Sequence, residues 1–344
     1  MKSKILTACL TVVALILVFS MASYGASDKV FKWRAQTYAV PGSVGFRAAD
    51  AAFKSLKEAT GGRLDITLYG AGTLVGAFEQ IDALNKGIFE VGHNAPAYYA
   101  GKDAAFSAIF SLAGVWPNSS EAKIWVDHFG GKELASELYA KYNIHYVGRV
   151  LSAPEPIMSK KPLKSLDDFK GLKIRTTPGL ASMLFQKIGA SPVPLPGGEI
   201  YTALDTGVVD AAEFVSLSEN WDIGLHEVSK YVLFPSFHCP TAICDIGVNA
   251  DAWKKLPPDL QAAMQMMIYE LSDRWDYMGQ AESVITLGKM VDLGLEHTTL
   301  PDADMKKARK IAVENAIEWK KKSPMAAKII DSILDYLKKR GIVE

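Results

Sequence analysis

The chain carries one short pattern twice: residues 83–91 read ALNKGIFEV, and residues 203–211 read ALDTGVVDA. In each copy a helical pattern ends at a glycine, Gly87 or Gly207, and an apolar strand pattern follows. A glycine in this place is typical of a helix that ends in the left-handed conformation. We therefore expect the same helix, turn and strand at two places in the chain.

The likeness extends upstream of both copies. The matching strand, helix and strand patterns lie at 32–34, 46–59 and 64–68 in the first copy, and at 173–175, 180–188 and 191–195 in the second. Alternating strands and helices are typical of a parallel sheet with crossover helices. The sequence therefore predicts an α/β fold of two Rossmann-like lobes. Because ligands bind beyond the carboxyl ends of such strands, we expect a ligand cleft between the lobes.

The rest of the chain reads as connections and helices. Strand patterns at 232–235 and 242–248 precede a helical stretch from Asp259 to about Met278, which continues with breaks toward Leu293, and two more helices at 302–323 and 326–340. We expect residues 27–151 plus 240–280 to form lobe I. Residues 152–239 plus 281–344 should form lobe II, together with the long C-terminal helices.

The N-terminus has the pattern of a secretory signal peptide, residues 1–26. Lys2 and Lys4 precede an apolar run, and small residues follow up to Ala26. The run of about 17 apolar residues also approaches the length of a membrane anchor, which is the alternative. We expect cleavage near Ala22 or Ala26, and hence an exported protein.

Composition and charge exclude several classes of function. The 344 residues include 38 Lys+Arg and 38 Asp+Glu, and removal of Lys2 and Lys4 with the signal leaves 36 basic residues, a charge close to −2. A nucleic-acid binder normally has a clear basic excess, so no nucleic-acid partner is expected. Cys239 and Cys244 remain after cleavage, and the compartment allows either a disulfide between them or two free buried thiols.

Motifs of enzymes are scarce. The sequence has no HExxH, no G-x-S-x-G elbow and no phosphate-binding loop. Residues 70–76, GAGTLVG, resemble a dinucleotide fingerprint with one extra residue, but the second copy has no such glycines, which favours a flexible turn. We therefore expect a binding protein and not an enzyme.

Candidate site residues lie where the predicted strands end. These are Tyr38 and Asn94 in the first copy and Arg175, Glu213 and Phe214 in the second. The planar, permanently charged fork of Arg175 suits a carboxylate, although it could instead pair with a neighbouring acid. Glu213 ends an apolar strand, so its carboxylate needs a cation, a ligand ammonium or Arg175 itself. Further candidates for contact with a ligand are Tyr98, Trp221 and His238.

Several motifs carry a resemblance to a known family. Residues 166–175 (LDDFKGLKIR) and 201–213 (YTALDTGVVDAAE), with Pro240-Thr241, Asn249, Trp253 and the 256–261 segment, are similar to the periplasmic solute-binding proteins of TRAP transporters, the DctP-type family. The resemblance covers nearly the whole chain after the signal. It implies a fold like that of type II periplasmic binding proteins. It also implies an organic acid as ligand and the membrane subunits of a TRAP transporter as partner.

The resemblance also implies roles for individual residues. The ligand-clamping arginine of the family corresponds to Arg175, and a second contact position falls at Glu155, where many members have arginine or glutamine. Phe214 stands where binders of sialic acid and C4-dicarboxylates often have asparagine. The branch that binds 2-oxo or 2-hydroxy monocarboxylates is more similar, and some of its members hold a metal ion between ligand and protein. Some relatives form homodimers, which the C-terminal helices here permit.

The charges of the predicted site narrow the range of possible ligands. One arginine beside two acids disfavours a dicarboxylate, because its second carboxylate would meet Glu155 and Glu213. A bound Na⁺ or Ca²⁺ could bridge Glu155, Glu213 and a 2-oxo or 2-hydroxy monocarboxylate, including one with a bulky apolar or aromatic tail. Alternatively, the ammonium of an amino acid, aromatic ones included, could take the place of the metal. The third alternative is a secreted hydrolase that uses Glu155 and Glu213 as paired carboxylates.

Overall fold

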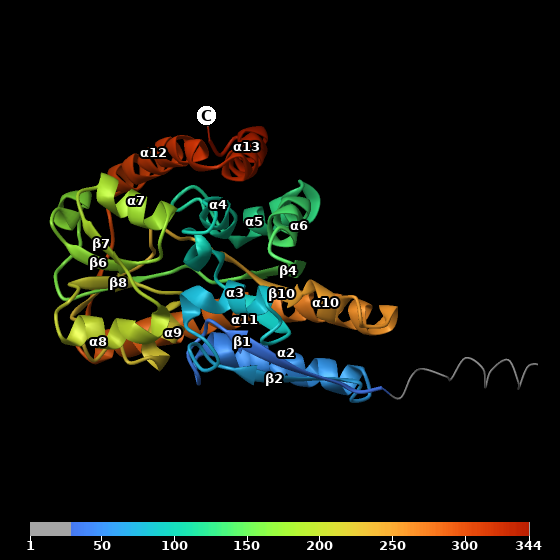
Figure 1. The fold of residues 1–344 in the computed structure, drawn as a ribbon. Helices are drawn as coiled ribbons and strands as arrows, with labels where there is room; N and C mark the ends of the chain where they lie inside the picture. The colour runs from blue at the N-terminus through green and yellow to red at the C-terminus, as the bar shows by residue number, and fades with distance from the viewer. Residues whose placement is uncertain (1–28, 344) are drawn as a thin grey trace, which may run out of the picture.

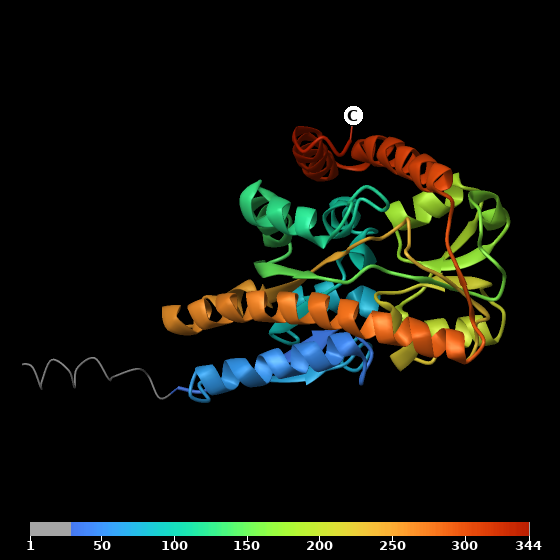
Figure 2. The same ribbon diagram turned by 180° about the vertical axis from the view of Figure 1, so that it is seen from behind.

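Two lobes stand side by side in the computed structural model, which describes residues 29–343 (Figure 1). Each lobe contains one β-sheet with helices packed against it, and one long helix runs along both lobes (Figure 2). The predicted α/β fold of two lobes is confirmed. The predicted signal peptide, residues 1–26, lies outside the described residues.

The first sheet has the strand order β2-β1-β3-β10-β4. Its strands are β1 (Phe31–Thr37), β2 (Leu64–Tyr69), β3 (Val91–Asn94), β4 (Ile144–Leu151) and β10 (Ile243–Asn249). The strands β2, β1 and β3 are parallel, as the repeat predicts, and β10 runs antiparallel to both β3 and β4.

The second sheet has the strand order β11-β9-β5-β8-β6-β7. Its strands are β5 (Ile157–Ser159), β6 (Lys173–Thr176), β7 (Ser191–Pro194), β8 (Ala211–Glu213), β9 (Tyr231–Leu233) and β11 (Glu296–Thr298). Here β7, β6 and β8 are parallel, and β5 is antiparallel to β8 and β9. The order β7-β6-β8-β5-β9 thus repeats β2-β1-β3-β10-β4 in spatial arrangement and direction, so the sequence repeat is a structural repeat.

The lobes exchange strands. The antiparallel strand β5 follows β4 of the first sheet along the chain, whereas β10 follows β9 of the second sheet. The chain therefore crosses between the lobes at 152–156 and again at 234–242. Each sheet is thus completed by a strand that directly follows, along the chain, a strand of the other sheet.

Corresponding helices follow the first strand of each repeat. They are α2 (Val44–Ala59) and α7 (Leu180–Lys187). The buried side chains of α2 include Ala48, Ala52 and Leu56, whose spacing of four residues puts them on one face against the first sheet. The shorter helices α3 (Gln80–Asn85) and α8 (Ile200–Asp205) precede Gly87 and Gly207, whose φ angles of 67° and 75° confirm the expected left-handed helix ends.

The other helices complete the layers around the sheets. They are α4 (Ala105–Phe110), α5 (Ser119–His128), α6 (Gly131–Ala140), α9 (Leu217–Asp222) and α10 (Ala250–Trp253), with the 3₁₀ turns η1 (Ala77–Glu79), η2 (Pro96–Tyr99), η3 (Leu166–Phe169), η4 (Gly197–Glu199) and η5 (Lys320–Lys322). The turn η2 follows β3 directly, so it stands at the carboxyl end of the first sheet and contributes to the site described below.

The helix α11 (Pro258–Asp292) is continuous over 35 residues, so the breaks expected after Met278 are wrong. Gly279 weakens the local helical preference. The helix continues because its neighbours hold it: α11 packs on α2 and β4 of the first lobe and on α9 of the second. Its rise of about 1.5 Å per residue gives a length of roughly 50 Å, enough to reach along both lobes (Figure 2).

The two C-terminal helices lie on different lobes. The helix α12 (Asp302–Trp319) packs on α7, and α13 (Pro324–Lys339) packs on α4 and α6 (Figure 1). This position of α13 differs from the expected grouping of residues 281–344 with lobe II, while the domain boundaries themselves stay a prediction. Within residues 29–343, no helix combines the length and the apolar character needed to cross a membrane.

Removal of a buried side chain from α11 should destabilise both lobes. Leu271 is fully buried, so Leu271→Ala should lower the free energy of unfolding by about 2–5 kcal/mol. The matched control is Val284→Ala on the same helix, where the side chain is 77% exposed; its effect should stay within about 0.5 kcal/mol. Urea unfolding followed by circular dichroism measures both, and equal effects would contradict the packing described for α11.

Candidate functional site

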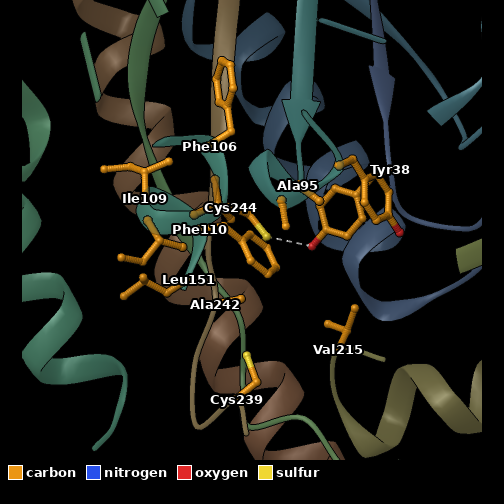
Figure 3. Packing of buried hydrophobic residues seen from close by; sticks show 14 of the residues in the cluster. Tyr38, Ala95, Phe106, Ile109, Phe110, Leu151, Val215, Cys239, Ala242 and Cys244 are labelled. Carbon is orange, nitrogen blue, oxygen red and sulfur yellow. Dashed lines mark hydrogen bonds between the residues drawn. The ribbon is translucent and has the colours of Figure 1, made fainter. Parts of the chain in front are cut away.

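The predicted strand-end residues meet between the two sheets. Tyr38 follows β1, Arg175 lies in β6 and Glu213 ends β8, while Glu155 comes from the crossover at 152–156. All four line one small cavity. Figure 3 shows Tyr38, Phe110, Val215 and Cys244 packed around this space. A second small cavity shares Phe110, Glu155, Thr177 and Glu213 with the first and adds Ser107, Ser111, His238 and Cys239 to its lining.

Arg175 is the central cation of the site and is 1% exposed. Its Nε donates to the carbonyl oxygen of Leu195 at 2.9 Å, and its Nη1 donates to the carbonyl oxygen of Glu213 at 2.6 Å. Its Nη2 donates to the hydroxyl of Tyr98 at 3.2 Å, across the gap between the lobes. Among the described residues Nη2 has this single partner, so its second hydrogen can bind a ligand oxygen.

Glu213 and Glu155 form a buried pair of acids beside Arg175. Oε1 of Glu213 accepts from the backbone N–H of Thr177 at 2.7 Å, and Oε2 lies 3.3 Å from Nη1 of Arg175. Burial raises the pKa of Glu213 to about 8, against the lowering effect of Arg175 and with a contribution from Glu155. Burial also raises the pKa of Glu155. Two acids thus face one cation, and the site can take up a second cation or a proton.

His238 completes this group. The imidazole Nδ1 is hydrogen-bonded to the Ser236 hydroxyl, and Nε2 lies 3.5 Å from Oε2 of Glu155. Burial lowers the pKa of His238 to about 4, so the ring is neutral near pH 7. Within residues 29–343, Nε2 has no hydrogen-bond partner. One potential ligand atom from each of Glu155, Glu213 and His238 lies within 4.8 Å of the others, a spacing that fits a metal ion.

Aromatic side chains enclose the cavity. The Tyr38 hydroxyl lies 3.1 Å from Sγ of Cys244, as the dashed line in Figure 3 shows. The Tyr98 hydroxyl, in η2, accepts from the backbone N–H of Gly197 in the second lobe at 3.2 Å. The ring of Phe214 lies 5.4 Å from Cζ of Arg175, within the range of a cation–π interaction. Tyr98 and Phe214 thus contact Arg175, and Tyr38 lines the same cavity.

Two expected site residues lie elsewhere. Asn94 is buried behind the cavity, where its Nδ2 donates to Asp245 at 2.9 Å and its Oδ1 accepts from the Tyr99 hydroxyl at 3.0 Å. All its polar atoms are used within the first lobe. Trp221 stacks on His226 with ring centroids 4.0 Å apart, and neither residue lines the cavity. The structure therefore brings neither Asn94 nor Trp221 to the site.

The sequence analysis missed several lining residues. The backbone N–H of Thr177 donates to Glu213. Nearly every residue type has such an N–H, so the sequence could not show this contact. Phe110 and Ser107 lie on α4, a short helix without a recognisable motif. Cys239 and Cys244 are free, buried thiols that line the two cavities, which decides between the two alternatives for them (Figure 3).

Comparison with known proteins gives a family match. Residues 36–322 match the family model described as bacterial extracellular solute-binding protein, family 7. The chain is 36% identical over 232 residues, 67% of its length, to a protein of Nostoc sp. (strain PCC 7120) described as a monocarboxylate 2-oxoacid-binding periplasmic protein. That alignment spans 63% of the Nostoc protein, a little less than two thirds of its length.

Solved structures are similar over nearly the whole chain. A TRAP transporter solute-binding protein of Bordetella bronchiseptica, a dimer with calcium and picolinate in one site, has a TM-score of 0.83 at 27% identity and covers 91% of this chain and 94% of its own. A TRAP periplasmic solute-binding protein of Pseudoalteromonas atlantica with bound sodium and pyruvate has a TM-score of 0.82 at 28% identity, with coverage of 90% and 95%.

Loss of the Tyr98 hydroxyl should loosen the contact between the lobes. Tyr98→Phe removes the acceptor of the Gly197 N–H and of Arg175 Nη2, so hydrogen exchange at Gly197 should accelerate. Tyr99→Phe is the matched control, because Tyr99 is the next residue, is equally buried and bonds within the first lobe. Exchange followed by mass spectrometry measures both variants. Similar exchange at Gly197 in wild type and Tyr98→Phe would contradict the contact.

Proposed function

This chain belongs to family 7 of the bacterial extracellular solute-binding proteins, and on that premise we propose that it captures a small organic monocarboxylate and delivers it to the membrane subunits of a TRAP transporter. Members of the family are periplasmic binding proteins of transport systems and not enzymes. The observation that carries the proposal is the buried guanidinium of Arg175, which faces Glu155 and Glu213 in a small cavity between the two lobes.

The charge of the site supports a monocarboxylate bound with a cation. Arg175 supplies one positive charge, and His238 is neutral near pH 7 because its pKa is about 4. A second carboxylate on the ligand would meet Glu155 and Glu213, whereas Na⁺ or Ca²⁺ would neutralise them. Carboxylate oxygens are the ligands that these hard cations prefer. In this proposal Glu155 and Glu213 hold the metal ion and Arg175 binds the carboxylate of the solute.

The ligands of the two structural relatives share a chemical feature. The pyruvate of the sodium-bound relative has a keto oxygen on the carbon next to its carboxylate, and the picolinate of the calcium-bound relative has a ring nitrogen in that position. A donor atom there lets a carboxylate oxygen and the second donor bind one metal ion together. This feature supports a 2-oxo or 2-hydroxy acid as the solute here.

The size of the cavity favours a small solute. The space around Arg175 is small, about 10 Å³, which is about the room that one water molecule needs. A solute can therefore enter only if the lobes move apart, and a small solute needs the least rearrangement. Tyr38, Phe110, Phe214 and Val215 close this space on the apolar side. We therefore prefer an acid of the size of pyruvate to one with a bulky aromatic tail.

An amino acid is the alternative solute, because its ammonium could bind Glu155 and Glu213 in place of the metal ion. The two acids beside one arginine support it, and sensitivity to chelation separates it from the first proposal. The hydrolase alternative, with the same two acids as a catalytic pair, is not retained because the family consists of binding proteins.

The cellular context belongs to the proposal as well. Family members are periplasmic, and the N-terminal pattern supports export with cleavage of residues 1–26. Delivery requires a surface that the membrane subunits recognise in the closed form, which both lobes would supply together. The homodimer stays a prediction.

Arg175→Lys tests the proposed site directly. Isothermal titration with pyruvate in the presence of Na⁺ or Ca²⁺ should show binding by the wild-type protein and an affinity at least about 30-fold lower in the variant, because lysine cannot replace the planar fork. Arg149→Lys is the matched control: Arg149 is 2% exposed, pairs with Asp127 and lies outside the cavity. It should bind pyruvate like the wild type.

Three other results would change the proposal. Equal affinity of Arg175→Lys and wild type for pyruvate would contradict the assignment of Arg175 to the binding site. Thermal stabilisation of chelator-treated protein by phenylalanine but not by pyruvate would favour the amino-acid alternative. The absence of stabilisation by any 2-oxo or 2-hydroxy acid, with and without cations, would overturn the monocarboxylate proposal. Stabilisation follows RT ln(1 + [L]/Kd), so a ligand at about 1,000 times its Kd should add about 4 kcal/mol.

Cation binding should depend on pH. The pKa of Glu213 is about 8 in the cation-free site, so below that pH a cation must displace a proton. Calcium should therefore raise the melting temperature more at about pH 8.5 than at about pH 6, with the apparent affinity falling toward tenfold per pH unit below the pKa. Glu213→Gln should lose this dependence. A calcium effect that is larger at low pH would contradict the assignment of Glu213.

A further inference from the structure

We propose that Glu219 and Ser107 form a two-part latch that holds the lobes closed, each residue capping the first helix of the opposite lobe. The proposal rests on the proposed function, because closure matters here as the step that retains a solute. Neither part is a contact with the solute carboxylate, which Arg175 binds. Both parts are hydrogen bonds between the lobes. In each, a side chain accepts from a backbone N–H at a helix N-terminus, where the N–H groups have no partner within the helix.

The first part connects α9 of the second lobe to α2 of the first. Oε1 of Glu219 accepts from the backbone N–H of Gly45, in the first turn of α2, at 2.7 Å. It also lies 3.5 Å from the hydroxyl of Ser43, the N-cap residue of that helix. A carboxylate at the N-terminus of a 16-residue helix interacts favourably with the helix dipole. The salt bridge between Arg47 and Asp222, at 3.0 Å, joins the same two helices.

The second part runs in the opposite direction. Oγ of Ser107, on α4 of the first lobe, accepts from the backbone N–H of Leu180 at 2.8 Å. Leu180 is the first residue of α7 in the second lobe. Because α2 and α7 are equivalent helices of the structural repeat, each lobe offers the same helix end to a side chain of the other.

Two glycines leave the space for these side chains. A Cβ on Gly45 would overlap Oε1 of Glu219 and would lie 3.0 Å from the ring of Trp275. A Cβ on Gly179, the residue before α7, would overlap Oγ of Ser107. Gly179 has a φ of 95°, which favours glycine by itself, but Gly45 is helical, where alanine would be more stable by about 1 kcal/mol. The approach of Glu219 and Trp275 therefore accounts for the glycine at position 45.

The latch residue Glu219 is built into the interface and is not a surface acid. Glu219 is 1% exposed, and its Oε2 has no hydrogen-bond partner within residues 29–343. Trp275 of α11 lies beside the same helix end, because a Cβ on Gly45 would contact both Glu219 and Trp275. Such a buried carboxyl would be rehydrated when the lobes separate. The bond to Gly45 is thus made on closing and lost on opening, so the latch changes the equilibrium between the two states.

Variants that break the latch should speed release of the solute without changing the contacts to it. With pyruvate and calcium as the probe, Glu219→Ala and Gly45→Ala should raise the dissociation rate at least about tenfold in stopped-flow measurements. The association rate should change by less than about threefold. Glu219→Gln keeps an acceptor oxygen and should retain most of the wild-type rate. Gly288→Ala, at an exposed glycine of α11 with nothing near its Cβ, is the matched control and should behave like the wild type.

A measurement without solute separates the latch from the proposed function. Cys239 and Cys244 are buried between the lobes, so their reaction with a thiol reagent reports opening. Glu219→Ala and Gly45→Ala should react several-fold faster than wild type, while Glu219→Gln and Gly288→Ala should not. If the wild type bound no 2-oxo or 2-hydroxy acid, the proposed function would be overturned and this result would still stand. Unchanged thiol reactivity and unchanged dissociation in both latch variants would overturn the latch.

Discussion

The buried ion pair of Arg175 and Glu213 is the constraint on which the rest of the site depends. Both side chains are almost inaccessible to solvent, and a charge in such a place is stable only if its hydrogen bonds are satisfied. The carbonyls of Leu195 and Glu213 and the hydroxyl of Tyr98 accept from the guanidinium, which keeps one Nη2 hydrogen for a ligand. The N–H of Thr177 donates to the carboxylate. Glu155 then adds a further buried acid, so the cavity contains two acids beside one permanent cation.

The repeat made most of the fold predictable. Its strands, helices and left-handed glycines are local features, and each is visible in a few neighbouring residues. The predicted lobe bounds already put residues 152–239 in one lobe and 240–280 in the other. The pairing of β5 was not visible, because β5 has only three residues and its partners β8 and β9 lie more than fifty residues further on. The continuity of α11 was also missed, since contacts with both lobes override the local effect of Gly279.

The site was predictable where strand ends define it. Arg175, Glu213 and Tyr38 were found because the carboxyl ends of parallel strands meet at one edge of a sheet. The same rule wrongly put Asn94 in the site. Its side chain is hydrogen-bonded to Asp245, 151 positions away in the sequence. Ser107 and Phe110 come from a helix without a motif, and Glu219 acts on a backbone N–H. No local pattern marks such residues, because their roles depend on what the opposite lobe places beside them.

The exchange of strands has a consequence for biosynthesis. In the first sheet, β3 and β4 are neighbours of β10 and not of each other, so this sheet stays split until residue 249 has been made. A nascent chain that ends at 151 has an unpaired edge on each of these two strands and no route to the final topology. The first sheet can therefore be completed only when the chain as far as residue 249 is available.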